Sequence, residues 1–178
     1  MKRSKVFNAG RYLWLAAALL LPLSLLVAAC AKKDDSAVLR QSIDRGARLA
    51  EEHQVGALLK LATPDFHALP GSYDATGVKG ILFAAFQHYG AMAIHYPRPY
   101  VTVAEGAASA STLIHFIIVS KDKSLPGLKE LYDDPQRWLE AASEKADLYQ
   151  LQLDWVKTKA GEWRVRQAEL KGFKGWGF

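Results

Sequence analysis

Apolar residues recur every three to four positions through the first half of the chain. From Ala37 to Lys60 they are separated by polar residues, which predicts an amphipathic helix with a bend at Gly56. Pro64 ends this stretch, because the residue before a proline disfavours helical geometry. A second helix is predicted over residues 76–89, with Gly90 placed to end it. Its apolar residues lie nearly all round the helix, so we expect it to be buried.

The period then shortens from helical spacing to alternation. Residues 100–103 and 112–119 are rich in β-branched and aromatic residues, which predicts two strands joined by a turn. The second is apolar on both faces, as in the centre of a sheet. Pro97 and Pro99 make the entry to the first strand irregular or place that strand at a sheet edge.

Helical character returns over residues 126–146, where Pro135 is placed to start the longer of two short helices. Residues 149–155 then alternate between apolar and polar, and residues 163–167 follow after a glycine-containing turn. The order is helices first, then a strand-rich half with one helical insertion. The sequence therefore predicts an α+β fold, with N-terminal helices packed on a mostly antiparallel sheet.

The first 29 residues have the composition of an export signal. Residues 1–11 carry four basic side chains and no acidic one, and residues 13–29 are uncharged and mostly apolar. Small residues, Val-Ala-Ala, come directly before Cys30, the single cysteine of the chain. This ending resembles the lipobox of bacterial lipoproteins. The resemblance implies that residues 1–29 are a signal peptide, that the Cys30 thiol is acylated, and that residues 30–36 link the lipid to the domain.

A lipid on Cys30 also accounts for an odd cysteine in an exported protein, because one cysteine can form no internal disulfide. The alternative is an uncleaved N-terminal membrane helix, although its seventeen residues are at the short end of the ~17–25 that span a bilayer. Either arrangement places the domain in the bacterial cell envelope, facing the periplasm. Residue 31 is alanine. Enterobacterial lipoproteins retained at the inner membrane favour aspartate there, so the resemblance favours the outer membrane.

Removal of the leader changes the charge of the chain. The full sequence has 23 basic and 18 acidic residues, a net charge of +5, but four of the basic residues lie in the leader. The remainder carries 19 basic and 18 acidic residues, a net charge of +1, with the two signs interspersed. A nucleic-acid-binding domain concentrates lysine and arginine on one face, so we expect no nucleic-acid partner.

Three features of this order resemble the cone-shaped fold of nuclear transport factor 2, SnoaL and ketosteroid isomerase. A helical stretch runs into Pro64 and Phe66, a buried helix precedes the first long hairpin, and residues 161–165 match the closing hairpin with its inward tryptophan. The resemblance covers residues 37–170, which we expect to form one domain. It implies a cystatin-like roll, in which a curved sheet wraps around the helices. The insertion over residues 121–147 departs from this pattern.

The same resemblance implies an apolar pocket at the wide end of the cone. Members of the superfamily use it for catalysis, for ligand binding, or as the core beneath an interaction surface, and fold alone does not choose among these uses. It also makes a homodimer through the open face of the sheet possible. The insertion is then either a lid particular to this chain or a sign of another α+β arrangement.

Sequence motifs of common enzyme chemistry are missing from this chain. It has no phosphate-binding glycine loop and no catalytic serine or zinc motif. Its five histidines include no close pair at metal-ligand spacing. We therefore expect neither a metal nor a cofactor.

Two groups of residues are candidates for acid-base catalysis. Asp65 or His67 could act as general base, with Tyr73 or Tyr96 as hydrogen-bond donor, if the loops that contain them border the pocket. His115 in the central strand is the other candidate, although the sequence does not say which face of the sheet it occupies. The simpler interpretation is that Asp65 caps a turn, His67 is solvated and His115 is a neutral core residue.

The candidate ligand-binding residues are side chains that the fold would bring to the pocket: Tyr73, Phe86, Tyr96, His115 and Trp155. Trp155 is equally consistent with core or cross-strand packing. The tail, residues 171–178, spaces Phe173, Trp176 and Phe178 with glycines. It could fold back over the sheet, bind a partner or touch the membrane.

These observations predict a membrane-tethered envelope lipoprotein whose domain binds an apolar small molecule or a protein partner without catalysing a reaction. The first alternative is a SnoaL-like or isomerase-like enzyme that uses an acid-base residue in an apolar pocket. The second is a structural subunit of an envelope complex, which would show an exposed apolar patch on the open sheet face or on the insertion.

Overall fold

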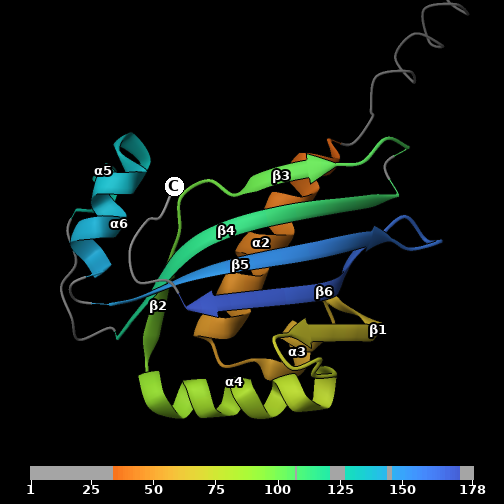
Figure 1. Cartoon of the computed structure of the whole chain (residues 1–178), viewed down its shortest axis with the longest axis horizontal. Coiled ribbons are helices and arrows are strands. Elements are labelled where there is room, and N and C mark those ends of the chain that lie inside the picture. The colour runs from red at the N-terminus through yellow and green to blue at the C-terminus, as the bar shows by residue number, and fades with distance from the viewer. Residues whose placement is uncertain (1–33, 107, 121–126, 144–145, 173–178) are drawn as a thin grey trace, which may run out of the picture. The chain divides into compact units, whose positions relative to one another are not determined.

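The computed structural model describes residues 34–106, 108–120, 127–143 and 146–172, so Cys30 and the tail beyond Gly172 lie outside the described residues. The strands are β1 (Ala62–Leu69), β2 (Met92–His95), β3 (Tyr100–Val103), β4 (Ser109–Ser120), β5 (Asp147–Lys157) and β6 (Trp163–Gly172). They form one sheet in the order β1-β6-β5-β4-β2, and β3 also pairs with β4 (Figure 1). β1 runs parallel to β6, and the other pairs are antiparallel.

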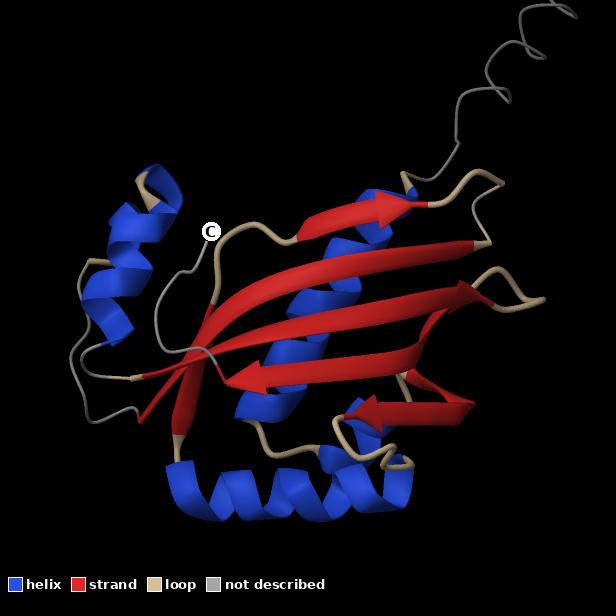
Figure 2. Cartoon of the chain, in the orientation of Figure 1, coloured by secondary structure: helices blue, strands red, loops and turns tan. Residues whose placement is uncertain are grey.

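The helices of the described residues are α2 (Asp35–Glu51), α3 (Val55–Leu59), α4 (Ala75–Tyr89), α5 (Leu128–Asp133) and α6 (Pro135–Ser143). α2 crosses one face of the sheet, and α4 runs along its margin from beside β1 to the start of β2 (Figure 2). α5 and α6 form the insertion between β4 and β5, and Pro135 begins the longer of the two, as predicted. The chain therefore has the predicted α+β architecture, with helices packed on a curved, mostly antiparallel sheet.

The pairing register divides the sheet into two faces. Residues directly opposite each other in an antiparallel pair point to the same side, so Ile114, Leu151 and Leu170 share one face. Leu39 and Ile43 of α2 pack in one cluster with this face. We call it the helix-facing side, and the other face the open side.

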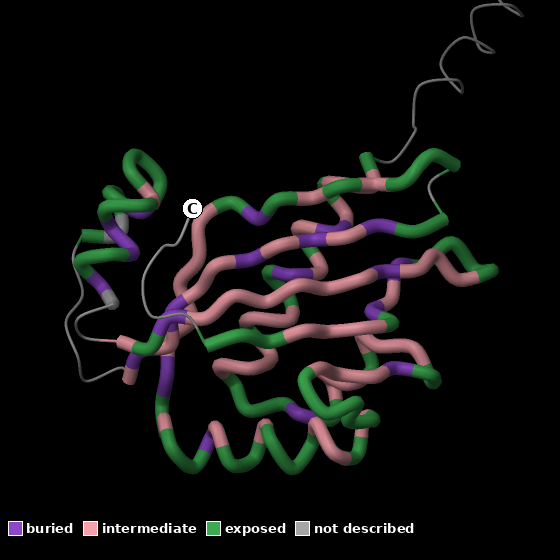
Figure 3. The backbone as a smooth tube through the Cα atoms, viewed as in Figure 1, coloured by how far each residue is buried: buried purple, intermediate pink, exposed green. Residues whose placement is uncertain are grey.

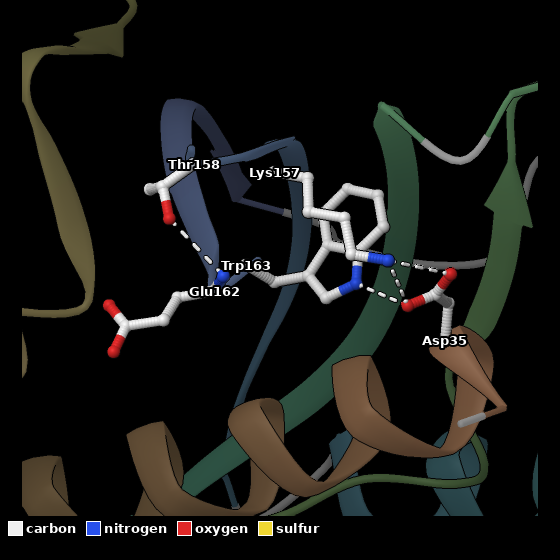
Figure 4. Close-up of polar contacts among 5 residues, drawn as sticks. All are labelled: Asp35, Lys157, Thr158, Glu162 and Trp163. Atoms are coloured by element: carbon white, nitrogen blue, oxygen red, sulfur yellow. Dashed lines mark hydrogen bonds and ion pairs between the residues drawn. The ribbon is translucent and has the colours of Figure 1, made fainter. Parts of the chain in front are cut away.

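The start of α2 is held against the last hairpin of the sheet. The carboxylate of Asp35 accepts hydrogen bonds from the Lys157 ammonium and from the Trp163 indole, each at 2.8 Å (Figure 4). These two hydrogen bonds lower the pKa of Asp35, so its charge is maintained well below neutral pH. The hairpin turn itself is closed by the Glu162 backbone N–H, which donates to the Thr158 hydroxyl at 3.2 Å.

Two further acidic residues fix the rest of α2. Asp44 accepts a hydrogen bond of 2.8 Å from the Tyr96 hydroxyl. Glu51, in the last turn of the helix, accepts one of 2.7 Å from the backbone N–H of Ile94 in β2. Because these contacts lie at the beginning, middle and end of α2, the helix cannot slide along the sheet without breaking at least one of them.

The first predicted helix is wrong in two details. The chain breaks at His53, which has a φ of 56°, and not at Gly56. A contact distant in sequence accounts for the break, because the His53 ring donates to the Gly90 carbonyl at 3.0 Å and stacks on Phe86. Pro64 lies inside β1, a strand that the sequence analysis did not predict. β1 is at the edge of the sheet, where the missing N–H of proline is tolerated.

The second predicted helix has the expected position but is not buried. α4 ends at Gly90, which has a φ of 59°, as predicted. Phe86 is buried, whereas Ile81 is 46% exposed and Phe83 is 51% exposed. α4 covers the margin of the sheet with one side only, so apolar residues on its other side contact solvent in the described part of the chain.

Candidate ligand-binding site

One end of the helix-facing side is closed. Leu39 of α2 is fully buried, and around it lie Trp155 at 2% exposure and Trp163 and Val165 at 8%. The Trp155 indole donates a hydrogen bond of 3.0 Å to the Thr112 hydroxyl inside this cluster. We call these four residues, Leu39, Trp155, Trp163 and Val165, the closed end. Their surfaces are already occupied by protein atoms.

The other end of the same side is incompletely covered. Phe116, Tyr149 and Leu151 are half-buried, and Leu170 is 41% exposed although it points to the helix-facing side. The end of β6 is drawn as exposed in Figure 3. We call these four residues the open end. The cause lies in strand length, because β1 stops at Leu69, opposite Glu169, and leaves the last residues of β6 without a partner on that edge. An apolar surface therefore remains accessible on the inner side of the sheet.

A chain of hydrogen-bonded polar groups borders the open end. The Tyr89 hydroxyl, at the end of α4, donates to Asp147 Oδ2 at 2.6 Å, and the Tyr149 hydroxyl lies 2.7 Å from the Tyr89 oxygen. Tyr89 has one hydroxyl hydrogen and gives it to Asp147, so Tyr149 donates to Tyr89. The Tyr149 ring stacks on Phe116 with a centroid distance of 5.5 Å. The hydroxyl chain is thus continuous with the apolar surface.

The protonation state of these hydrogen-bonded groups suits ligand recognition better than proton abstraction. Burial raises the pKa of Tyr89, and the hydrogen bond to Asp147 raises it further. Tyr89 is therefore a neutral hydroxyl at physiological pH and not a base. The Tyr149 oxygen retains lone pairs that can accept a hydrogen bond from a ligand. The arrangement offers an apolar surface with one polar contact at its border, which is the usual composition of a small-molecule site.

The predicted acid-base residues do not converge on the open end. His67 and His115 both lie on the open side of the sheet, on β1 and β4, with β6 and β5 between them. The His67 Nε2 donates to the Gln167 side-chain oxygen at 2.8 Å. Burial lowers the pKa of His115, against the effect of a hydrogen bond with Gln150, so its imidazole is neutral at physiological pH.

Asp65 is exposed on the edge strand β1, and not in a loop as the sequence analysis expected. A hydrogen bond from Thr63 lowers the pKa of Asp65, which makes the carboxylate a weaker base. A general base works best with a pKa near the working pH. The lowered pKa of Asp65 therefore makes this carboxylate unsuited to act as a general base.

The predicted ligand-binding residues are spread over the molecule. Phe86 and Trp155 belong to the buried core, and His115 lies on the open side. Tyr96 packs against the closed-end cluster and bonds to Asp44, and burial raises its pKa. Tyr73 is 47% exposed on the loop after β1. The structure therefore does not bring these five side chains together in one place.

The described part of the insertion, α5 and α6, packs on the open side of the sheet. Ile117 points to the open side and packs with Leu131, Trp138 and Leu139 of α5 and α6. The insertion thus covers one end of the open side. The remainder of that side carries mostly polar residues, such as Gln152.

Two searches of the described residues gave negative results. No group of three or more histidine, cysteine, aspartate or glutamate side chains is placed to hold a metal ion. Among the helices from residue 35 onward, none has the length and hydropathy needed to cross a membrane.

Sequence reasoning missed all four residues of the open end, and it also missed Tyr89 and Asp147 at its polar border. Tyr89 and Tyr149 are separated by 60 positions, and only the folded sheet brings their hydroxyls together. One signal was available, because residues 149–155 alternate so that Tyr149 lies on the same face as Trp155. The composition of residues 69–74 predicts a loop, and β1 ends at Leu69, but the sequence does not show that β1 pairs with β6 and stops before Leu170.

The comparisons with known proteins agree with this geometry. No family model and no curated protein matches the chain. Among solved structures, a nuclear transport factor 2-like protein with a cystatin-like fold from Novosphingobium aromaticivorans matches with a TM-score of 0.57 at 17% identity, covering 89% of this chain and 90% of its own. A protein of unknown function with a cystatin-like fold from Nostoc punctiforme matches with a TM-score of 0.60 at 7% identity, covering 80% and 93%.

A third structure, a putative scytalone dehydratase from Novosphingobium aromaticivorans, matches with a TM-score of 0.54 at 12% identity, covering 79% of this chain and 85% of its own. Identities this low carry information on the fold and none on the activity. The described domain thus has the cystatin-like fold of nuclear transport factor 2-like proteins.

Proposed function

We propose that this chain is a lipoprotein of the bacterial envelope whose domain binds an apolar small molecule at the open end. The observation that carries the proposal is the incomplete burial of four residues on the inner side of the sheet: Leu170 is 41% exposed, and Phe116, Tyr149 and Leu151 are only half-buried at the margin of the core. Apolar residues on the inner face of a sheet normally belong to the buried core, so their exposure here requires an explanation. Occupation by a ligand provides one.

Binding is favoured over catalysis by the position of the titratable groups. An enzyme needs its acid, base and donor groups to converge on one place. Here His67 and His115 lie on the opposite side of the sheet, and Asp65 is on its outer edge. The groups that do reach the open end are the hydroxyls of Tyr89 and Tyr149, and burial raises the pKa of Tyr89, so this hydroxyl can orient a bound molecule but not act as a base.

The tether is the second part of the proposal. The lipobox-like sequence before Cys30 supports acylation there, and the domain begins only five residues later, at Asp35. We expect the mature protein to face the periplasm, with the outer membrane favoured. Replacement of Cys30 by serine should abolish the mass of the acyl chains and release the protein from the membrane fraction, and an unchanged mass and fractionation would contradict this part.

Binding can be tested with residues 31–178, since the chain from Asp35 onward is one compact unit with its own hydrophobic clusters. The apolar fluorophore N-phenyl-1-naphthylamine serves as the probe. Leu170→Arg places a charge on the apolar surface, so it should weaken probe binding by about tenfold or more, or ~1.4 kcal/mol.

The control is Tyr100→Arg, which alters a residue that is 70% exposed on the open side. It should leave the dissociation constant within about twofold of the original, or ~0.4 kcal/mol. Equal weakening in both variants, or no binding by the unaltered protein, would reject the site.

A further inference from the structure

Helix α4 turns an apolar face to solvent. Three of the six large apolar side chains that are exposed in the described residues belong to α4 or to the loop before it: Tyr73, Ile81 and Phe83. Five exposed positions of α4 follow one another at helical spacing and carry no charge: Thr76, Gly80, Phe83, Ala84 and Gln87. An exposed helix face of this composition is typical of an interaction surface.

The centre of this face permits close approach of another helix. Gly80 lies in the middle of α4, where glycine is less favourable than alanine. A Cβ atom at Gly80 would meet nothing within 4 Å, so packing inside the domain does not account for the glycine. Ala84 lies one turn later on the same face and is also exposed. Two small residues one turn apart let the backbone of a second helix lie directly against α4.

The two ends of α4 carry groups that complement each other. Asp74 caps the start of the helix and accepts a hydrogen bond of 2.8 Å from the Gly77 N–H through Oδ1, and its second oxygen can accept another. His88 lies in the last turn and is exposed. An antiparallel pair of α4 helices places Asp74 of one copy near His88 of the other, twice by symmetry. The same orientation also opposes the two helix dipoles favourably. A second copy of this face therefore matches it in both shape and charge.

The size of the face limits the strength of such a pair. α4 has 15 residues, which corresponds to a length of about 22 Å. One helix pair of this length buries less than the ~800 Å² per partner of a standard interface. The dimer is therefore a weak one, with a dissociation constant of about 10–100 μM.

We propose that the domain forms a homodimer in which two α4 helices pack antiparallel, with Gly80 of each helix against Ala84 of the other. The two-fold axis then passes close to position 82, so the two Phe83 side chains lie beside each other and leave the solvent. This interface is at the margin of the sheet and not on its open side. The inference goes beyond the proposed function and does not depend on ligand binding.

Sedimentation velocity of residues 31–178 measures the association. Gly80→Leu should raise the dissociation constant by about tenfold or more, because the larger side chain holds the two backbones apart. The variant should remain folded, since the Cβ position is open and leucine favours a helix more than glycine does. Gly80→Ala keeps the side chain small and should change the constant by less than about threefold. An unspecific apolar association would instead become stronger in Gly80→Leu.

A disulfide tests the antiparallel register. Cys30 is the single cysteine of the chain and lies outside residues 31–178, so an introduced cysteine can pair only with a second copy. Phe83→Cys places the two thiols beside the two-fold axis and should give a disulfide-linked dimer under mild oxidation. The matched control is Tyr132→Cys, at a position that is 72% exposed on α5, and it should remain largely monomeric.

Three outcomes would overturn the proposal. The first is a monomer at all concentrations. The second is a dimer that Gly80→Leu leaves unchanged or that gives equal disulfide yields in Phe83→Cys and Tyr132→Cys, because that dimer would use another surface. The third is a monomer that floats with vesicles of phosphatidylethanolamine and phosphatidylglycerol and no longer does so after Phe83→Glu, which would assign the face to a lipid surface.

Discussion

Both ends of the helix-facing side carry apolar residues of β5 and β6, but only one of them is fully covered. Leu39 at the closed end is fully buried, whereas Leu170 at the open end is 41% exposed. Hydrophobicity cannot explain the difference, since both ends are apolar. The covering elements explain it: α2 begins directly over the closed end, and β1 stops before it reaches the end of β6.

The comparison also separates the roles of the polar contacts at the two ends. Asp35 at the closed end bonds to Lys157 and Trp163, and so ties the start of α2 to the sheet. Tyr89 and Tyr149 at the open end bond to each other, and the Tyr149 ring stacks on Phe116, which is only half-buried. The first group of contacts stabilises the fold. The second lies where a ligand would bind.

The largest expected difference in stability comes from replacing a leucine by alanine at each end. Leu39→Ala removes a fully buried side chain and should lower the free energy of unfolding by roughly 2–5 kcal/mol. Leu170→Ala removes a side chain that is partly in solvent and should cost under about 1 kcal/mol. Urea denaturation measures both values. A loss at Leu170 as large as that at Leu39 would show that the open end is part of the core.

A smaller loss of stability is expected when the ion pair between Asp35 and Lys157 at the closed end is removed. Asp35→Asn removes the ion pair with Lys157 and should lower the urea midpoint at pH 7 by less than Leu39→Ala does. The folded-state pKa of Asp35 is below its ordinary value of 3.8. Its contribution is therefore present above that pH and is lost as the pH falls through the lower folded-state value.

The difference between the original protein and Asp35→Asn should accordingly vanish in acid. Asp133→Asn, an exposed carboxylate at the end of α5, is the control and should leave the midpoint unchanged. A difference that persists undiminished at low pH would mean that Asp35 acts through packing and not through its charge.

The smallest effect concerns the hydroxyl chain at the open end. Tyr89→Phe removes one hydrogen bond to Asp147 and one from Tyr149, and should cost about 0.5–1.5 kcal/mol. Because the folded-state pKa of Tyr89 is raised, its stabilising contribution is present below pH 10.0 and is lost as the pH rises through the folded-state value. The absorbance change of tyrosine ionisation near pH 10 should therefore be the same in both proteins. A smaller change in Tyr89→Phe would mean that Tyr89 ionises near pH 10 in the original protein, which would contradict its raised pKa.

Most of the fold could be predicted from the sequence, because periodicity reports which face of an element is apolar. The strands at residues 100–103, 112–119 and 149–155 and the helix over residues 76–89 are present as predicted. Two strands were missed: β2 has only four residues, too few for a clear alternation, and β1 contains Pro64, which is tolerated in a strand only at a sheet edge. The helix break at His53 depends on its contact with Gly90, which no local pattern reveals.

The site was less predictable than the fold. The sequence pointed to titratable residues, but the pairing register decides which face each of them occupies, and a shift of one residue reverses it. His115 is on the open side for this reason. The open end instead depends on where β1 and α4 terminate, and on a hydroxyl pair 60 positions apart.

The central claim is that the open end binds an apolar molecule, and a nuclear magnetic resonance titration of residues 31–178 with N-phenyl-1-naphthylamine tests it most directly. The account predicts that the largest shifts occur at Phe116, Tyr149 and Leu170, with Tyr100 and His115 on the open side unaffected. Shifts centred on the open side, or none at saturating probe, would contradict it.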